Sequence, residues 1–193
     1  MELKGKKIIL ASNSPRRKEL LAGLDVEFSA DTRNNSEEVI PCDADPSAVP
    51  ALMSEGKSGG FWRELTDDEI LVTADTMVVC DGEMMGKPHG KEEAEHMLRT
   101  LSGREHQVIT AVTVRDNKRR KTVSDCANVW FKNLTDSEIS YYIGKWKPFD
   151  KAGAYGIQEW IGYIGIEKIE GSFFNIMGLP VHLLYSLLLE FVG

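Results

Sequence analysis

The chain has 193 residues, of which 42% are hydrophobic and 27% charged, and its formal net charge at pH 7 is −7. This length predicts one ordinary domain over residues 1–193. The longest apolar stretch, residues 179–189, is too short to cross a bilayer, and the negative net charge does not suit a polynucleotide-binding surface. Three cysteines without metal-ligand spacing predict neither a disulfide framework nor a zinc site. We therefore expect a cytoplasmic protein with no membrane or polynucleotide partner.

The first half of the chain alternates strand and helix patterns, the order typical of an α/β protein. We expect strands over residues 7–11 and 26–30, a helix from residue 15 to about 23, an irregular loop over 31–46 and a helix over 47–63. β-Branched segments at 70–73 and 77–80 flank Ala74-Asp75-Thr76, and Asp81-Gly82 predicts a hairpin turn.

The second half predicts further helices over residues 91–101, 135–144 and 181–191, a long hairpin of strands 108–114 and 122–131, and a strand over 161–169. Four small residues in the run 147–158 carry too little bulk for a core, and they suit a backbone that a ligand approaches closely. These are Ala152, Gly153, Ala154 and Gly156.

The helix that begins at residue 15 has an unusual charge in its first turn. Ser14 is a good N-cap, Pro15 suits the first helical position, and three cations follow: Arg16, Arg17 and Lys18. A helix N-terminus already carries partial positive charge, so this turn costs stability unless an anion binds there. The N–H groups of the turn with Ser14, Arg16 and Arg17 therefore predict a phosphate-binding cradle. The alternative is a solvated basic turn.

Acidic residues in two places could serve a metal ion. Asp75 lies in an apolar strand, a costly position for a carboxylate unless it is paired, hydrogen-bonded or bound to metal, although a strand-end Asp can also cap a turn. Glu37 and Glu38 lie in the loop, where acids are usually solvated. Together with Asp75 they could form an all-oxygen site of the kind that Mg²⁺ or Mn²⁺ prefers beside phosphates.

Three lysines lie next to small or rigid residues: Lys57, Lys87 and Lys151. A lysine on such a frame can act as a point charge for a phosphate oxygen. The alternatives are a simple Gly-Lys-Pro turn at Lys87 and a surface pair between Asp150 and Lys151.

No nucleophile motif accompanies these residues. The four histidines lack metal-ligand spacing, and no Gly-x-Ser-x-Gly elbow or Walker A loop is present. These residues therefore favour direct attack by water on a phosphorus centre, for which the chain supplies a candidate base, candidate ligands for a divalent ion, and cations.

Five short segments, in order, resemble the Maf family of nucleoside triphosphate pyrophosphatases. They are Leu10-Ala11-Ser12-Asn13-Ser14-Pro15-Arg16-Arg17, Ala74-Asp75-Thr76, Gly86-Lys87-Pro88, residues 150–158 (Asp-Lys-Ala-Gly-Ala-Tyr-Gly-Ile-Gln), and Gly171-Ser172 through Gly178-Leu179-Pro180. The resemblance implies an α/β fold with a mixed twisted sheet flanked by helices, in two lobes around a cleft and related to inosine triphosphatase. It also suggests a homodimer.

The resemblance implies roles for individual residues. The family's proton acceptor falls on Asp75, and its acid and lysine positions fall on Glu38, Lys57 and Lys87. Its substrate-selective positions fall on Arg16, Thr76 and Gln158, in the form of the branch that prefers dTTP and UTP. The Gln158 amide offers a donor and an acceptor, which match O4 and N3–H of a uracil or thymine ring.

The leading hypothesis is hydrolysis of dTTP, UTP or modified pyrimidine nucleotides to the monophosphate and pyrophosphate. Ser14, Arg16 and Arg17 would hold the phosphates, with Glu38 and Asp75 on a divalent ion and Lys57, Lys87 and Lys151 as further cations. The alternative is a nucleotide-binding regulator of cell division and septum formation with little turnover, because the family is linked to that process. A purely structural domain would leave the cationic helix start unexplained.

Overall fold

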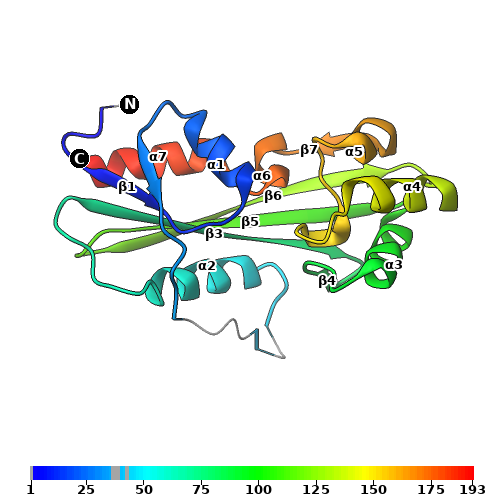
Figure 1. Ribbon diagram of the computed structural model, residues 1–193, viewed down its shortest axis with the longest axis horizontal. Helices are drawn as coiled ribbons and strands as arrows, with labels where there is room; N and C mark the ends of the chain where they lie inside the picture. Colours follow the sequence, from blue (N-terminus) through cyan, green and yellow to red (C-terminus); the bar gives the residue numbers. More distant parts are fainter. Residues whose placement is uncertain (1, 36–39, 42–43) are drawn as a thin grey trace. The chain divides into compact units, whose positions relative to one another are not determined.

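The computed structural model describes residues 2–35, 40–41 and 44–193 (Figure 1). Its strands are β1 (Lys7–Leu10), β2 (Phe28–Ala30), β3 (Glu69–Cys80), β4 (Glu83–Met85), β5 (Glu105–Arg115), β6 (Arg120–Phe131) and β7 (Ile166–Glu170). They pair in the order β2-β1-β3-β5-β6-β7, with β4 paired to β3. Because β1 is parallel to β2 and β3 while β4 and β7 are antiparallel to their partners, the sheet is mixed and the expected α/β class is confirmed.

The helices are α1 (Pro15–Ala22), α2 (Val49–Gly59), α3 (Lys91–Leu101), α4 (Asp136–Trp146), α5 (Trp160–Gly165), α6 (Phe173–Met177) and α7 (Val181–Val192), with a 3-10 turn η1 at Ala152–Ala154. Within the described part of the chain, none of these helices has the length and apolar character needed to cross a bilayer.

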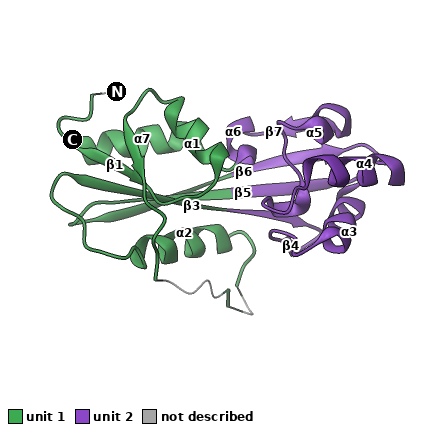
Figure 2. Cartoon of the chain, in the orientation of Figure 1, with its two compact units in different colours: residues 1–75, 110–125, 178–193 green, residues 76–109, 126–177 purple. Residues whose placement is uncertain are grey.

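The chain divides into two compact units, shown in different colours in Figure 2. Unit 1 comprises Met1–Asp75, Thr110–Asp125 and Gly178–Gly193, and unit 2 comprises Thr76–Ile109 and Cys126–Met177. The prediction of a single domain over residues 1–193, and that of a cleft between two lobes, stay predictions.

Unit 1 packs helices on both faces of its strands, with α1 and α7 on one side and α2 on the other (Figure 1). Helix α7 buries residues spaced three and four apart, the pattern of an amphipathic helix on a core: Leu184, Leu187, Leu188 and Phe191. On β1, Ile8, Ile9 and Leu10 are all buried. Burial on both faces explains why the strand is continuously apolar after Lys7, which is exposed.

Unit 2 contains the predicted Asp81-Gly82 hairpin turn and α4 with its cap. Asp81 and Gly82 have φ values of 50° and 82°, so this turn between β3 and β4 has the two left-handed residues that tight hairpins favour. Thr135 and Glu138 form a reciprocal capping box at the start of α4. Helix α3 packs against α4 and η1.

The strand expected over residues 161–169 is wrong in its first half. Helix α5 occupies Trp160–Gly165, and β7 begins only at Ile166. The β-branched and aromatic composition favours a strand, but burial follows a helical spacing, since Ile161 and Gly165 are buried while Tyr163 is 82% exposed. A β-carbon on Gly162 would collide with the carbonyl oxygen of Ile157, so α5 folds closely onto the preceding turn.

The bounds of two expected elements change. The segments 70–73 and 77–80 belong to one continuous strand, β3 (Glu69–Cys80), so Asp75 lies inside a strand, and the helix expected over 47–63 is limited to Val49–Gly59. The small residues 152–154 do belong to a packed interior: the Gly153 amide donates to the Gly86 carbonyl at 3.1 Å, and a β-carbon on Gly153 would lie 2.9 Å from Val78. The packing of Val78 against Gly153 therefore requires a residue without a side chain at this position.

A buried histidine in unit 2 predicts acid sensitivity. His106 is 2% exposed, its Nε2 lies 2.8 Å from the Tyr155 hydroxyl, and its ring meets Phe131 edge-on. Burial lowers its pKa from 6.5 to about 4. The unfolded chain therefore binds this proton more readily than the folded chain, and stability that is present above pH 6.5 is lost as the pH falls toward 4.

The expected loss is about 3 kcal/mol of unfolding free energy from His106 alone. A His106→Gln variant keeps a polar partner for Tyr155 but cannot be protonated, so its unfolding free energy should vary less between pH 7 and pH 4. Urea denaturation of both proteins across this range measures the difference. Parallel pH profiles would show that His106 does not cause the acid sensitivity.

Candidate active site

The cationic start of α1 forms as expected. The Ser14 hydroxyl accepts from the Arg17 amide at 3.5 Å, the Ser14 amide donates to the buried Ser12 hydroxyl at 3.2 Å, and Pro15 follows the cap. The first turn contains no acidic residue. The partial positive charge of the helix N-terminus is therefore not offset by an acid within this turn, which suits the turn to an anionic ligand.

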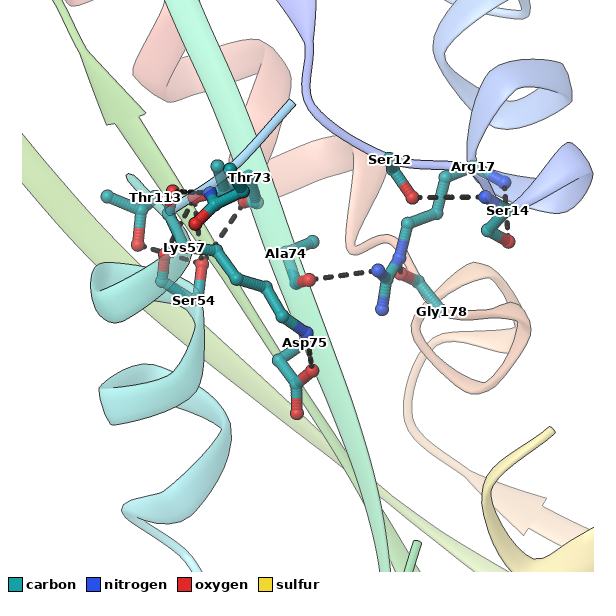
Figure 3. Close-up of polar contacts among 11 residues, drawn as sticks. Ser12, Ser14, Arg17, Ser54, Lys57, Thr73, Ala74, Asp75, Thr113 and Gly178 are labelled. Atoms are coloured by element: carbon teal, nitrogen blue, oxygen red, sulfur yellow. Dashed lines mark hydrogen bonds and ion pairs between the residues drawn. The ribbon is translucent and has the colours of Figure 1, made fainter. Parts of the chain in front are cut away.

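Arg17 points into unit 1 and bonds to the main chain (Figure 3). Its Nε donates to the Gly178 carbonyl at 2.8 Å and its Nη1 donates to the Ala74 carbonyl at 2.9 Å. Burial lowers the pKa of this guanidinium, and the charge of Asp75 partly opposes that shift. Arg17 thus connects α1 to β3 and to the turn before α7. Arg16, on the same helical turn, is half-buried.

Asp75 forms an ion pair with Lys57 from α2. The Lys57 ammonium lies 2.5 Å from Asp75 Oδ1, and the two side chains are 22% and 16% exposed. Thr73 and Asp75 are two residues apart on β3, so they point to the same face of the strand, where α2 lies (Figure 3). Lys57 thus neutralises the charge of Asp75, and because both side chains are partly exposed, solvent or a ligand can still reach the pair.

A buried hydroxyl network fixes α2 against the sheet. Thr73 Oγ1 donates to the Ser54 carbonyl at 2.8 Å, and the Ser54 hydroxyl lies 2.8 Å from that of Thr113. Ser54 and Thr73 are 0% exposed. Ser54 precedes Lys57 by one helical turn, and Thr73 precedes Asp75 by two strand residues. The network therefore sets the register in which Lys57 meets Asp75 (Figure 3).

Sequence reasoning missed this network, although a signal for it was present. Thr73 interrupts the apolar run Ile70-Leu71-Val72, and a hydroxyl inside a buried strand requires a hydrogen-bond partner.

One of the two carboxylates expected to hold a divalent ion, Asp75, lies among the described residues. Glu38, one of the two expected ligands, lies outside the described residues. Among residues 2–35, 40–41 and 44–193, no three His, Cys, Asp or Glu side chains gather closely enough to hold a metal. Asp75 does supply a carboxylate, and Mg²⁺ is commonly held by one or two carboxylates together with substrate phosphates. The Asp75 carboxylate fits this mode of Mg²⁺ binding, in which substrate phosphates supply further ligands.

The remaining predicted residues belong to unit 2. Thr76 continues β3 directly after Asp75, and Lys87 is exposed just after β4. The Lys151 side chain is only 8% exposed, and its ammonium pairs with Asp150 at 2.8 Å and with Glu159 at 3.1 Å.

Gln158 lies in the turn before α5. Its Oε1 is buried and has no hydrogen-bond partner among the described residues. A buried acceptor of this kind is costly unless a ligand or water satisfies it.

Two residues near Gln158 were not singled out from the sequence. Glu159 accepts a short hydrogen bond from the Tyr142 hydroxyl, and that hydroxyl also accepts from the Gly156 amide at 3.0 Å. Tyr142 is fully buried on α4 beside Ile139 and Ile143. A Tyr within an apolar helical stripe needs a partner for its hydroxyl, and this was the available signal.

Fold and site together define an α/β protein whose cationic helix start suits an anionic ligand and whose strand β3 carries an ion-paired carboxylate. A family model described as Maf-like protein matches residues 7–191. The chain belongs to the Maf family, and the resemblance seen in its motifs is confirmed.

Close relatives cover almost the whole chain. A protein of Porphyromonas gingivalis (strain ATCC 33277), named dTTP/UTP pyrophosphatase, is 49% identical over 191 residues, which cover 98% of this chain and 96% of the relative. A protein of Bacteroides thetaiotaomicron with the same name is 48% identical and covers 93% of each chain. One of Christiangramia forsetii, again so named, is 43% identical over 99% of this chain and 97% of its own length.

Proposed function

We propose that this protein is a nucleoside triphosphate pyrophosphatase that hydrolyses dTTP and UTP to the monophosphate and pyrophosphate. The observation that carries the proposal is the partly buried pair of Asp75 and Lys57, a carboxylate positioned to accept a proton with a cation beside it. The substrates follow from the name that the relatives share at 43–49% identity over nearly the full chain. These similarities favour the enzyme over the regulator of cell division.

In the proposed mechanism, Asp75 accepts a proton from the water that attacks the α-phosphorus. A bond forms between the water oxygen and the α-phosphorus, and the bond from that phosphorus to the bridging oxygen breaks. Pyrophosphate leaves with the electron pair. Lys57 balances the charge beside Asp75, while the N–H groups after Ser14 and the Arg16 side chain bind phosphate oxygens.

A divalent cation, Mg²⁺ or Mn²⁺, would be held by Asp75 and Glu38. Its chemistry would be to neutralise charge on the phosphate chain.

For the base, we assign recognition to Gln158. Its buried Oε1 has no partner among the described residues, so the N3–H of a uracil or thymine ring could satisfy it. Thr76 and Lys87 retain the substrate-binding roles that the family resemblance implies. Lys87 is exposed, and no described residue forms an ion pair with it, so its ammonium is available to phosphate.

Incubation with a panel of nucleoside triphosphates and Mg²⁺ tests the function. We expect the monophosphate and pyrophosphate from dTTP and UTP, with slower release from purine nucleotides and from dCTP. Chromatography of the nucleotide products distinguishes this cleavage from stepwise loss of single phosphates. Binding of dTTP without pyrophosphate release would instead support the regulator.

A further inference from the structure

The turn that carries Gln158 is held at both ends by side chains of unit 2. Gln158 has three flexible side-chain torsions, so reading a base requires that its backbone be fixed. The Glu159 amide donates to the Gly156 carbonyl at 3.0 Å, which closes a tight turn around Ile157 and Gln158. Ile157 is buried, and α5 packs so closely on it that residue 162 has no room for a side chain.

A chain of polar contacts then fixes this turn to α4. The Tyr142 hydroxyl accepts from the Gly156 amide and donates to Glu159 Oε2, while Glu159 Oε1 pairs with the buried Lys151. Burial raises the pKa of Tyr142, and the hydrogen bond to Glu159 raises it further, so the phenol stays protonated and remains a donor. The residue before Ile157 and the residue after Gln158 are therefore bound to one phenol.

Gly156 shows how closely these groups fit. A β-carbon at this position would lie 2.8 Å from Glu159 Cδ and 2.9 Å from its Oε2. The Glu159 carboxylate is held by Tyr142 and Lys151, so it could not move aside without breaking those contacts. The carboxylate thus packs closely against the Gly156 backbone and restricts the conformation of the turn.

We propose that Glu159 and Tyr142 are positioning residues for Gln158 and set the enzyme's selectivity for the pyrimidine base. Lys151 serves the same purpose by neutralising the Glu159 carboxylate. The proposal rests on the proposed function, because it concerns how that function distinguishes its substrates. In the proposed mechanism the proton acceptor is Asp75, and these three residues act only through Gln158.

Steady-state kinetics of Glu159→Gln and Tyr142→Phe with dTTP, UTP and ATP test the proposal. Loss of one charge-assisted hydrogen bond should raise KM for dTTP and UTP about tenfold and lower their kcat/KM relative to that for ATP by a similar factor. The kcat for dTTP should change less than about threefold, since Asp75 and Lys57 are untouched. The double variant should cost less than the two single effects combined, because both changes break the same chain of contacts.

Two matched controls accompany these variants. Glu167→Gln removes the same charge from an exposed position on β7, and Gly144→Ala adds a methyl group on α4 where nothing lies within 4 Å. Both should keep the KM and the base selectivity of the parent. Gly156→Ala, by contrast, should reproduce the loss of selectivity, because its β-carbon displaces Glu159.

The outcomes separate the two proposals. If the parent protein releases no pyrophosphate from dTTP or UTP, the proposed function fails. If the parent is active but Glu159→Gln and Tyr142→Phe keep its KM and its preference over ATP, the positioning role is overturned. A uniform fall of kcat for all three nucleotides, with a lower melting temperature, would show a merely structural role and would also overturn it. Tyr142→Phe removes a single oxygen atom and keeps the ring, so it still tests the positioning role if Glu159→Gln folds poorly.

Discussion

Replacing Asp75 by Asn is expected to lower kcat for dTTP hydrolysis by about 10²–10⁴-fold, the range over which a positioned general base contributes. The amide has the size of the carboxylate and can still accept a hydrogen bond from Lys57, but it cannot take a proton from water. Nucleotide binding and the melting temperature should change little. Pyrophosphate release measures turnover, and calorimetry with dTTP measures binding.

The matched control is Asp81→Asn. Asp81 lies in the exposed hairpin turn with φ of 50°, a conformation that Asn adopts as readily as Asp. This change removes the same charge and should leave kcat unaltered. If Asp75→Asn retained turnover close to that of the parent, Asp75 would not be the base, and the mechanism would need another proton acceptor.

The sequence predicts elements best where local chemistry agrees with burial. Helix α3 begins and ends at the predicted residues because its apolar stripe and its Ser102-Gly103 stop coincide. The α1 start is equally local, since Ser14 and Pro15 define it without tertiary help. The candidate residues of unit 1 were found for the same reason, because an Asp in an apolar strand and cations in a first helical turn each break a local rule.

Contacts between distant segments could not be predicted in this way. The Ser54–Thr73 hydroxyl contact joins residues 19 apart, and its role in setting the Lys57–Asp75 register depends on how α2 lies on β3. The direction of Arg17 is the clearest case, because three adjacent cations look equivalent in the sequence.

Arg17→Lys is expected to destabilise the fold by about 2–3 kcal/mol, because a lysine cannot reach both carbonyls that the guanidinium holds. Ala74 and Gly178 each receive one hydrogen bond from Arg17, from Nη1 and Nε respectively. Burial makes the loss of either bond costly. Urea denaturation measures the change. Because Ala74 precedes Asp75, the variant should also lower kcat through a less fixed β3.

Arg16→Lys separates this backbone role from phosphate binding. Arg16 shares the first turn of α1 with Arg17, and we propose that its guanidinium donates two hydrogen bonds to phosphate oxygens. The lysine should therefore preserve the unfolding free energy and raise KM for dTTP, because a point charge replaces a bidentate donor. The two variants should thus change different quantities: Arg17→Lys should lower the unfolding free energy, and Arg16→Lys should raise KM for dTTP. If Arg17→Lys raised KM at unchanged stability, the phosphate would be the principal partner of Arg17, and its two carbonyl contacts would contribute little to the fold.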